Sequence, residues 1–313
     1  MAPALPPVID YSLAFDIRSM SRLAPCLRAY TRRAVSDTNP PITSLLRRFT
    51  KVEFVVLAVA GGSLFFIPDI ARLIWPWALT PFNMRFLGAI YLASLVGVAM
   101  LLRVGRWEPA RLVAPQIFTF TVVVLIVSWM NLGRFGPTSL ITVAWFVLYT
   151  ALPINAAYYV WTSRASGSPG PTPLSGSLRA YLLIQGLITG AYGLGLLIAP
   201  GPSSAFWPWT IDDFHGQMYS AAFLTLAVGS LIVWRSASRV EVVTLGAIQF
   251  TLGLLSILGL AIVDLSVHRV AWQAAGTVAW SGAFLVILLT GITMIRAAGS
   301  SSRDQANARE LEL

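Results

Sequence analysis

The sequence predicts an all-α integral membrane protein of eight transmembrane helices, arranged as two parallel four-helix repeats. Three observations lead to this fold class. Of the 313 residues, 56% are hydrophobic and only 11% are charged, whereas soluble domains carry about 25% charged residues. Eight apolar runs have the length that a helix needs to cross a bilayer. A Trp-Pro-Trp motif occurs twice, once in each half of the chain.

Residues 1–49 are predicted to form a basic cytoplasmic arm. The arm is rich in arginine and poor in acidic residues, and it lacks the apolar core of a secretory signal. We expect an amphipathic helix near residues 11–34 that lies on anionic lipid headgroups. An organellar transit peptide, which has a similar composition, is the alternative.

The apolar runs and the segments between them define the expected domains. A Gly/Pro/Ser-rich segment at 163–177 predicts a cytoplasmic linker. It joins a first repeat at 50–162 to a second repeat at 178–296, and residues 297–313 form a cytoplasmic tail. The expected spans are 52–67, 86–102, 112–130, 139–161, 178–199, 217–234, 242–263 and 270–295.

The basic residues predict the orientation of these spans. With a cytoplasmic N-terminus, the inner segments hold 18 of the 22 basic residues and the outer segments hold 4. Because cytoplasmic segments are enriched in Lys and Arg, we expect both termini in the cytoplasm and the chain in the plasma (inner) membrane. The charge is spread over loops rather than gathered on a soluble domain, so nucleic acid is not an expected partner.

The two halves match over a long register, which predicts a duplication. Pro68, Phe82 and Arg103 each recur in the second half at a constant offset of 132, and so do both tryptophans of the motif. After one inserted residue, Gln116 matches Gln249 at an offset of 133. Each copy contains four spans, an even number, so both copies have the same orientation in the membrane and the repeat is parallel.

The first motif and its surroundings resemble a known group of proteins. Trp75-Pro76-Trp77, followed by Leu79-Thr80-Pro81 and Gly88-Ala89, is similar to uncharacterised multi-pass membrane proteins of high-GC bacteria. The resemblance covers the repeat core and not the N-terminal arm. The second copy departs from it, with Thr210-Ile211-Asp212-Asp213 after its Trp-Pro-Trp. The resemblance implies a multi-pass membrane fold and no mechanism.

The two Trp-Pro-Trp loops are the first candidate binding region, and we expect both on the outer side. Indole rings favour the headgroup region, so paired interfacial anchors that close the bundle are one interpretation. An aromatic-walled site for a lipid, quinone or pigment between the halves is the other. The candidate residues are Trp75, Trp77, Trp207 and Trp209.

Polar residues at the outer helix ends are further candidates. His215 and His268, the only two histidines, have the chemistry to ligate a haem, a tetrapyrrole or a metal ion. Their spacing selects no ligand pair, and a wetted polar cap is the simpler interpretation. We expect Arg85 either to reach the headgroups or to contact an anion or lipid phosphate. The sequence requires no cofactor.

Inside the predicted spans we expect amides but no carboxylate, lysine or histidine near the middle. Ion-coupled carriers usually keep an ionisable group at that depth. Gln116 and Gln249 are expected to hydrogen-bond across helices, and closely spaced glycines at 186–195 to let another helix approach. Glu108 and Glu241 lie beside arginines and are expected to form structural ion pairs at the inner loops.

No nucleotide-binding, serine-hydrolase, zinc-protease or Cys-x-x-Cys motif accompanies these residues. The sequence therefore favours a binding, accessory or assembly subunit of a membrane complex over an enzyme, with the lipid bilayer and another membrane protein as partners. Two alternatives stay open. One is a permease-like carrier of a neutral or hydrophobic solute through the seam between the repeats. The other is an enzyme that acts on lipids or quinones at the outer face.

Overall fold

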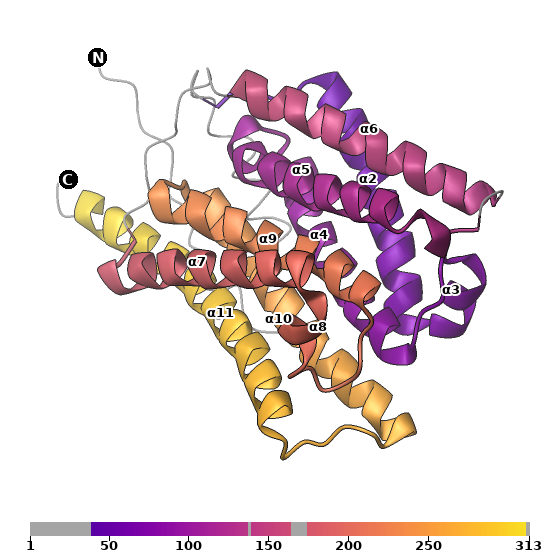
Figure 1. Ribbon diagram of the computed structural model, residues 1–313. Coiled ribbons are helices and arrows are strands. Elements are labelled where there is room, and N and C mark those ends of the chain that lie inside the picture. Colours follow the sequence, from indigo (N-terminus) through magenta and orange to yellow (C-terminus); the bar gives the residue numbers. More distant parts are fainter. Residues whose placement is uncertain (1–38, 137–138, 164–173, 311–313) are drawn as a thin grey trace.

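The computed structural model describes residues 39–136, 139–163 and 174–310. In this part of the chain eight helices are long and apolar enough to cross a membrane, which confirms the predicted all-α membrane fold (Figure 1). The amphipathic helix expected in the arm lies outside the described residues. The spanning helices are α2 (Ser44–Phe66), α4 (Pro81–Val104), α5 (Trp107–Met130), α6 (Leu140–Ser163), α7 (Gly176–Ile198), α9 (Asp213–Arg235), α10 (Arg239–Val267) and α11 (Ala275–Glu310).

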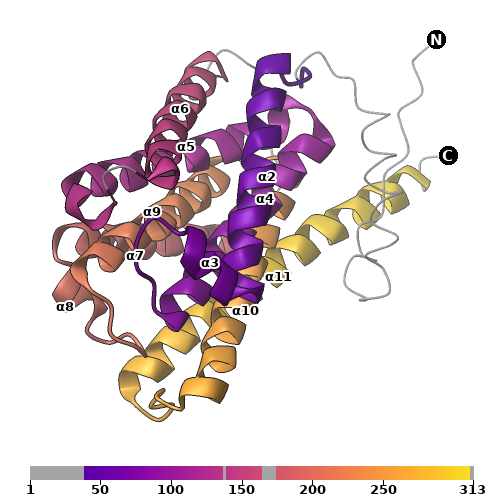
Figure 2. The same cartoon turned by 90° about the vertical axis from the view of Figure 1, so that its right-hand side faces the viewer.

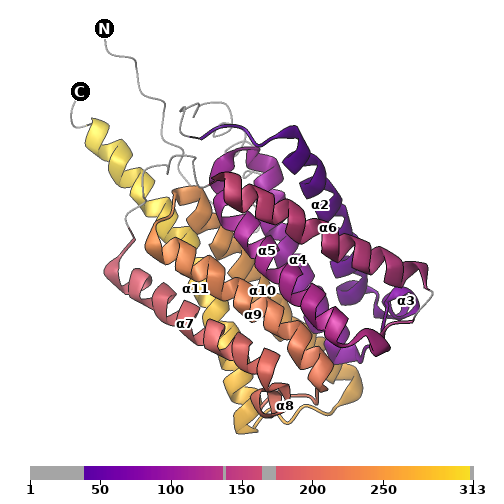
Figure 3. The same cartoon turned by 45° about the horizontal axis from the view of Figure 1, so that its top comes forward.

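Short helices precede the two Trp-Pro-Trp loops. They are α3 (Pro68–Ile74) and α8 (Pro200–Ser204), and each begins with a proline, whose fixed φ suits the first helical turn. Both lie at the same end of the bundle (Figure 3). A single 3₁₀ turn, η2 (Leu132–Arg134), links α5 to the segment before α6.

Two helices extend well beyond their apolar runs. Helix α2 begins at Ser44, ahead of the predicted start at 52, because Thr43 caps it by accepting a hydrogen bond from the backbone N–H of Leu46. Helix α11 begins at Ala275, after the predicted start at 270, and continues to Glu310. An apolar run measures the part of a helix that crosses the bilayer, whereas caps and turns decide where the helix begins and ends.

The helices of the two halves interlock. Within the halves, α2 packs along α4, α5 along α6, α7 along α9 and α10 along α11. Between the halves, α4 packs against α10 and α5 against α9, as two views show (Figures 1 and 2). The consecutive helices α4 and α5 make little contact with each other, and the same holds for α9 and α10. The second and third helices of each half therefore diverge.

Helix positions recur along the chain. Helices α2 and α7 begin at residues 44 and 176, and α4 and α9 begin at 81 and 213, a difference of 132 in both cases. Helices α5 and α10, which begin at 107 and 239, have the same spacing. This recurrence is what the predicted duplication requires. The two-repeat arrangement and its domain boundaries stay predictions.

Small residues set the distance between paired helices. A Cβ atom added to Gly186 or Gly193 of α7 would lie 2.8 Å from a leucine side chain of α9, so the expected close approach at 186–195 is confirmed. The pair α10 and α11 is closer still, since a Cβ on Gly291 would lie 2.5 Å from the carbonyl oxygen of Gly246. Such contacts let membrane helices gain van der Waals energy without a hydrophobic driving force.

Ionic and polar contacts fasten the opposite end of the bundle. Arg111 Nε of α5 lies 3.1 Å from Glu241 Oε1 of α10, which confirms the ion pair expected for Glu241. The carboxylate of Glu108 accepts a hydrogen bond of 3.0 Å from the side chain of Asn39. Backbone bonds also tie the segment before α2 to the turn at Gly105, whose φ of +63° suits a glycine.

Candidate functional site

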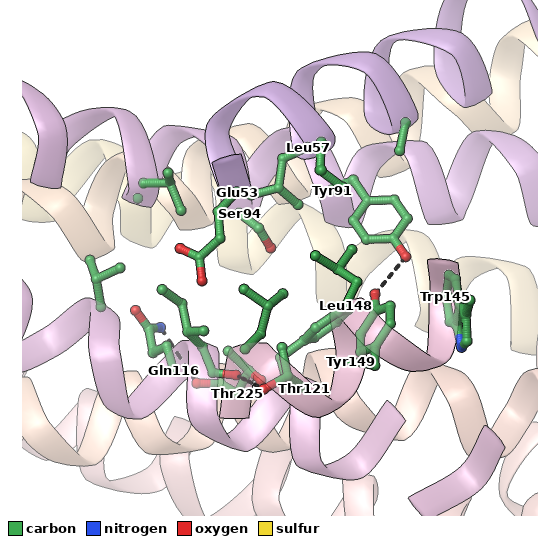
Figure 4. A pocket seen from close by; sticks show the side chains of 18 of the residues that line it. Glu53, Leu57, Tyr91, Ser94, Gln116, Thr121, Trp145, Leu148, Tyr149 and Thr225 are labelled. Atoms are coloured by element: carbon green, nitrogen blue, oxygen red, sulfur yellow. Dashed lines mark hydrogen bonds between the residues drawn. The ribbon is translucent and has the colours of Figure 1, made fainter. Parts of the chain in front are cut away.

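A cavity of about 340 Å³ lies among α2, α4, α5 and α6 (Figure 4). It lies between α4 and α5, which make little contact with each other because α4 packs against α10 and α5 packs against α9. Thr225 of α9 and Ile248 of α10 complete its floor. Its aliphatic lining comprises Val56, Leu57, Ala60, Val98, Val113, Ile117, Ile141, Ala144, Leu148, Leu152 and Ile248. The site is therefore a largely apolar space within the helix bundle.

Glu53 is the one carboxyl group in the lining that the structure describes. It is the tenth of the 23 residues of α2 and is only 5% exposed. Its Oε1 atom has no hydrogen-bond partner among the described residues. Figure 4 shows the carboxyl group pointing into the cavity towards Gln116 on the opposite wall. A buried carboxyl without a partner is costly, so its place beside an open space points to a ligand.

Glu53 is buried at the start of the predicted first span, a position where the apolar run gives no sign of burial. The predicted first span starts at Val52, which would put this residue at the membrane surface. Helix α2 begins at Ser44, so the carboxyl group lies more than two turns from the start of the helix, and the expectation about carboxylates at the middle of the membrane stays a prediction. The charged first turns of α2 hide its length from a search for apolar runs.

The other polar groups of the cavity are largely satisfied. The hydroxyl group of Ser94 donates to the carbonyl oxygen of Ile90 at 2.9 Å, and that of Thr121 donates to the carbonyl oxygen of Ile117 at 2.7 Å. Gln116 donates a long bond of 3.5 Å to the carbonyl oxygen of Thr225. The hydroxyl group of Thr225 and the indole N–H of Trp75, also in the lining, have no hydrogen-bond partner among the described residues, so Glu53 is not the sole unpartnered polar residue of the cavity.

Aromatic side chains close one end of the cavity. The hydroxyl groups of Tyr91 and Tyr149 lie 2.8 Å apart and are hydrogen-bonded (Figure 4). The rings of Trp75 and Trp145 meet edge to face at 5.8 Å, and the indole of Trp145 donates to the hydroxyl of Ser128 at 3.0 Å. The first Trp-Pro-Trp loop thus contributes a wall of the cavity through Trp75.

The other tryptophans of the two loops pack between the halves. Trp77 meets the ring of Phe214 edge to face at 5.2 Å. Trp209 stacks on Phe82 at 5.4 Å and donates a hydrogen bond of 2.9 Å to the side chain of Asn83. Each loop therefore reaches the first turn of the second helix in the other half, and Trp77 and Trp209 do not line the cavity.

Trp207 contacts both halves, since its ring also meets that of Phe86 of α4 edge to face at 5.1 Å. It donates a hydrogen bond of 2.6 Å to the hydroxyl of Tyr192 and stacks on Tyr219 at 5.5 Å. Trp77 and Trp207 are buried, at 8% and 7% exposure. Both tryptophans belong to the hydrophobic core, whereas an interfacial anchor keeps part of its indole in the headgroup region.

The two matched glutamines occupy different surroundings, although both hydrogen-bond across helices as expected. Gln116 lines the cavity. Gln249 is fully buried and donates to the side-chain oxygen of Gln185 at 3.0 Å, and Ser230 donates to the same oxygen at 3.2 Å. The second half thus has an amide network, in which Gln185 Nε2 and Gln249 Oε1 lack partners among the described residues, where the first half has a cavity.

His215 is part of a chain of charged groups at the start of α9. Its Nδ1 atom lies 2.6 Å from Asp212, whose other carboxylate oxygen lies 3.5 Å from Arg134. Burial opposes ionisation of Asp212. Hydrogen bonds from His215 and the charges of His215 and Arg134 outweigh this effect and hold the pKa of Asp212 below its usual value. These contacts stabilise the N-terminus of α9.

The structure gives the two histidines unlike positions. His215 borders a cavity of about 10 Å³, which has room for a water molecule but not for a haem. His268 is exposed and ends α10 with a left-handed φ of 51°. In the parts of the chain that are described, no group of three or more His, Cys, Asp or Glu side chains is placed to hold a metal ion.

Arg85 lies beside an aromatic ring in the first turns of α4. Its guanidinium is 5.6 Å from the centre of the Phe65 ring, a cation–π contact. A Cβ atom added to Gly259 of α10 would lie 3.1 Å from the Cβ atom of Arg85. Arg85 therefore contributes to packing between α2, α4 and α10, and it does not line the cavity.

Of the candidate binding residues named from the sequence, Trp75 and Gln116 line the cavity, whereas Glu53, Tyr91 and Tyr149 line it without having been named. The binding roles of these residues stay predictions. The repeat register holds a signal for Glu53, because its counterpart at the offset of 132 is Gln185, a buried amide. A polar residue at both matched positions indicates that this position of the helix faces the interior of the bundle. The tyrosines carry no such signal.

The chain was compared with protein-family models, with curated proteins and with solved structures, and none of them matches it.

Proposed function

We propose that this multi-pass membrane protein acts by binding, and that it holds an apolar small molecule in the cavity among α2, α4, α5 and α6. The observation that carries the proposal is a space of about 340 Å³ with a largely apolar lining and few polar groups. Binding sites for small molecules have volumes of roughly 300–1,000 Å³ and linings of this kind. An empty apolar space of this size would otherwise cost packing energy.

Access from the lipid supports this function. Helices α2 and α6 make little contact with each other, and both contribute lining residues that reach the outer surface. Ile141 of α6 is 38% exposed and Ala144 is exposed, while Leu57 of α2 is half-buried. An apolar molecule dissolved in the acyl chains therefore has a route between these two helices.

The position of the cavity favours an accessory binding role over passage through the seam between the halves. Close packing of α4 on α10 and of α5 on α9 fills the seam, and the cavity lies beside it. Within the described lining, the side chains of types that perform acid–base catalysis are Glu53, Tyr91 and Tyr149, and the two tyrosine hydroxyls are hydrogen-bonded to each other. Co-purification with a membrane partner, without transport by the reconstituted chain, is the result that fits this role.

Filling the cavity tests the binding function. Leu148 points into the cavity from α6 (Figure 4), and we expect Leu148→Trp to lower the affinity for a neutral apolar probe about tenfold. The probe is benzophenone, which attaches covalently to contacting residues on illumination. The measurement is the concentration of benzophenone that half-saturates the labelling of cavity peptides, read by mass spectrometry of the purified chain in lipid nanodiscs.

The neighbouring position supplies a matched control for this substitution. Val147 is 63% exposed and does not line the cavity, so Val147→Trp adds the same side chain towards the lipid. We expect it to leave the labelling unchanged. Equal labelling in the wild type and both variants, or labelling confined to the lipid-facing surface, would overturn the proposed function.

We also propose the orientation and the setting of the chain. The excess of basic residues in alternate loops supports cytoplasmic termini in a plasma (inner) membrane, with the arm on anionic lipid. In a chain whose Cys26 is replaced by serine, a cysteine at Gly133 should react with an impermeant maleimide in intact cells. A cysteine at Ser177 should react only after permeabilisation. The reverse pattern would invert the topology.

A further inference from the structure

We propose that the ligand of the cavity is a lipophilic organic cation, with the carboxylate of Glu53 as its counter-ion. This inference rests on the proposed function and names the class of molecule that the site selects. Three observations carry it: the unpartnered carboxyl group, the aromatic wall, and the contrast with the matched position in the second half.

The carboxyl group lacks a protein partner of opposite charge. The ion pairs given for the described residues do not include Glu53, and the lining of the cavity contains no lysine, arginine or histidine. Glu53 is 5% exposed, and its Oε1 atom has no hydrogen-bond partner. A carboxyl group buried in this way keeps its proton unless an opposite charge reaches it and stabilises the ionised form. A cationic ligand supplies that charge.

The aromatic wall suits the same ligand. Five aromatic side chains line the cavity, from the first Trp-Pro-Trp loop and from α4, α5 and α6. Faces of indole and phenol rings attract organic cations, and they are the usual recognition element for quaternary ammonium groups. The remaining aliphatic lining accommodates an apolar body. The residues of this wall are Trp75, Tyr91, Phe120, Trp145 and Tyr149.

The second half shows what this position looks like when it serves packing alone. Gln185, the counterpart of Glu53 in the repeat register, is 5% exposed and accepts hydrogen bonds from Gln249 and Ser230. This position therefore holds a neutral amide whose oxygen accepts two bonds, while its Nε2 atom has no hydrogen-bond partner among the described residues. The first half has a carboxyl group and a cavity at the matched place, so the charge is not a requirement of helix packing.

Two probes of nearly equal shape isolate the charge. Phenyltrimethylammonium carries one positive charge, and tert-butylbenzene has carbon in place of nitrogen. Each competes with benzophenone labelling of the purified full chain in nanodiscs of neutral lipid. We expect both to compete in the wild type. In Glu53→Gln we expect the affinity for the cation to fall about tenfold or more, while tert-butylbenzene competes as before.

Unchanged competition by tert-butylbenzene in Glu53→Gln also shows that this variant is folded. Asp69→Asn is the matched control, since it removes a carboxylate that is 92% exposed on α3, and it should leave the affinity for the cation unchanged. Competition by tert-butylbenzene but not by the cation in the wild type would overturn the cation assignment and leave the binding function intact. So would equal competition by the cation in the wild type and Glu53→Gln. Failure of both probes and of benzophenone would overturn the binding function as well.

Discussion

Replacement of Gly291 by alanine is expected to destabilise the protein by about 1–3 kcal/mol, the cost of overpacking a well-packed interior. A Cβ at this position would lie 2.5 Å from the carbonyl oxygen of Gly246 and 2.5 Å from the backbone nitrogen of Phe250. Both neighbours are backbone atoms, so α10 and α11 must separate to make room. Thermal unfolding of the purified chain in detergent measures the effect.

A second glycine of α11 provides the control. A Cβ added to Gly282 would meet no atom within 4 Å, so Gly282→Ala should gain the helix propensity of alanine, roughly 1 kcal/mol or less. The two variants make the same chemical change in the same helix. Equal unfolding temperatures for Gly291→Ala and Gly282→Ala would contradict the close packing of α10 on α11.

Loss of the Arg111 side chain is expected to be the most damaging change at the other end of the bundle. Arg111→Ala leaves the carboxylate of Glu241 buried, with no exposed surface, beside the backbone of Ser238. Removing one partner of a buried ion pair costs about 3–5 kcal/mol, because the other charge stays uncompensated. The unfolding free energy of the variant in detergent gives the size of the loss.

A double variant separates the charge from the packing. In Arg111→Met with Glu241→Gln the charge is gone from both sides, and the introduced glutamine can still cap the helix through its amide oxygen. We expect most of the stability lost in Arg111→Ala to return. A double variant as unstable as Arg111→Ala would mean that side-chain volume, rather than an unpaired charge, causes the loss.

The sequence predicts the spans well because bilayer crossing is a local property. Every apolar run becomes a helix, since a backbone in lipid must satisfy its own hydrogen bonds. Helix ends are less accessible to this reasoning. The first turns of α2, with Arg47 and Arg48, are helical yet too charged to count as an apolar run, and this hides the position of Glu53 in the interior of a helix.

The packing between helices far apart in the chain is beyond prediction from one sequence. The pairing of α4 with α10 and of α5 with α9 leaves no trace in hydropathy, because both faces of such helices are apolar. The cavity is a consequence of that pairing. Trp75 and Gln116 can therefore be named for their chemistry, while Tyr91 and Tyr149 become visible only when the walls are in place.

The interlocking of the halves has a consequence for how the protein is made. Helix α4 is complete at Val104, but its partner α10 begins at Arg239. At ribosomal rates of about 5–20 residues per second, α4 waits on the order of ten seconds for that partner. Helix α5 likewise waits for α9. During this interval the newborn chain holds two hairpins with unfilled faces in the membrane, so lipids or an insertion factor must cover them until the second half arrives.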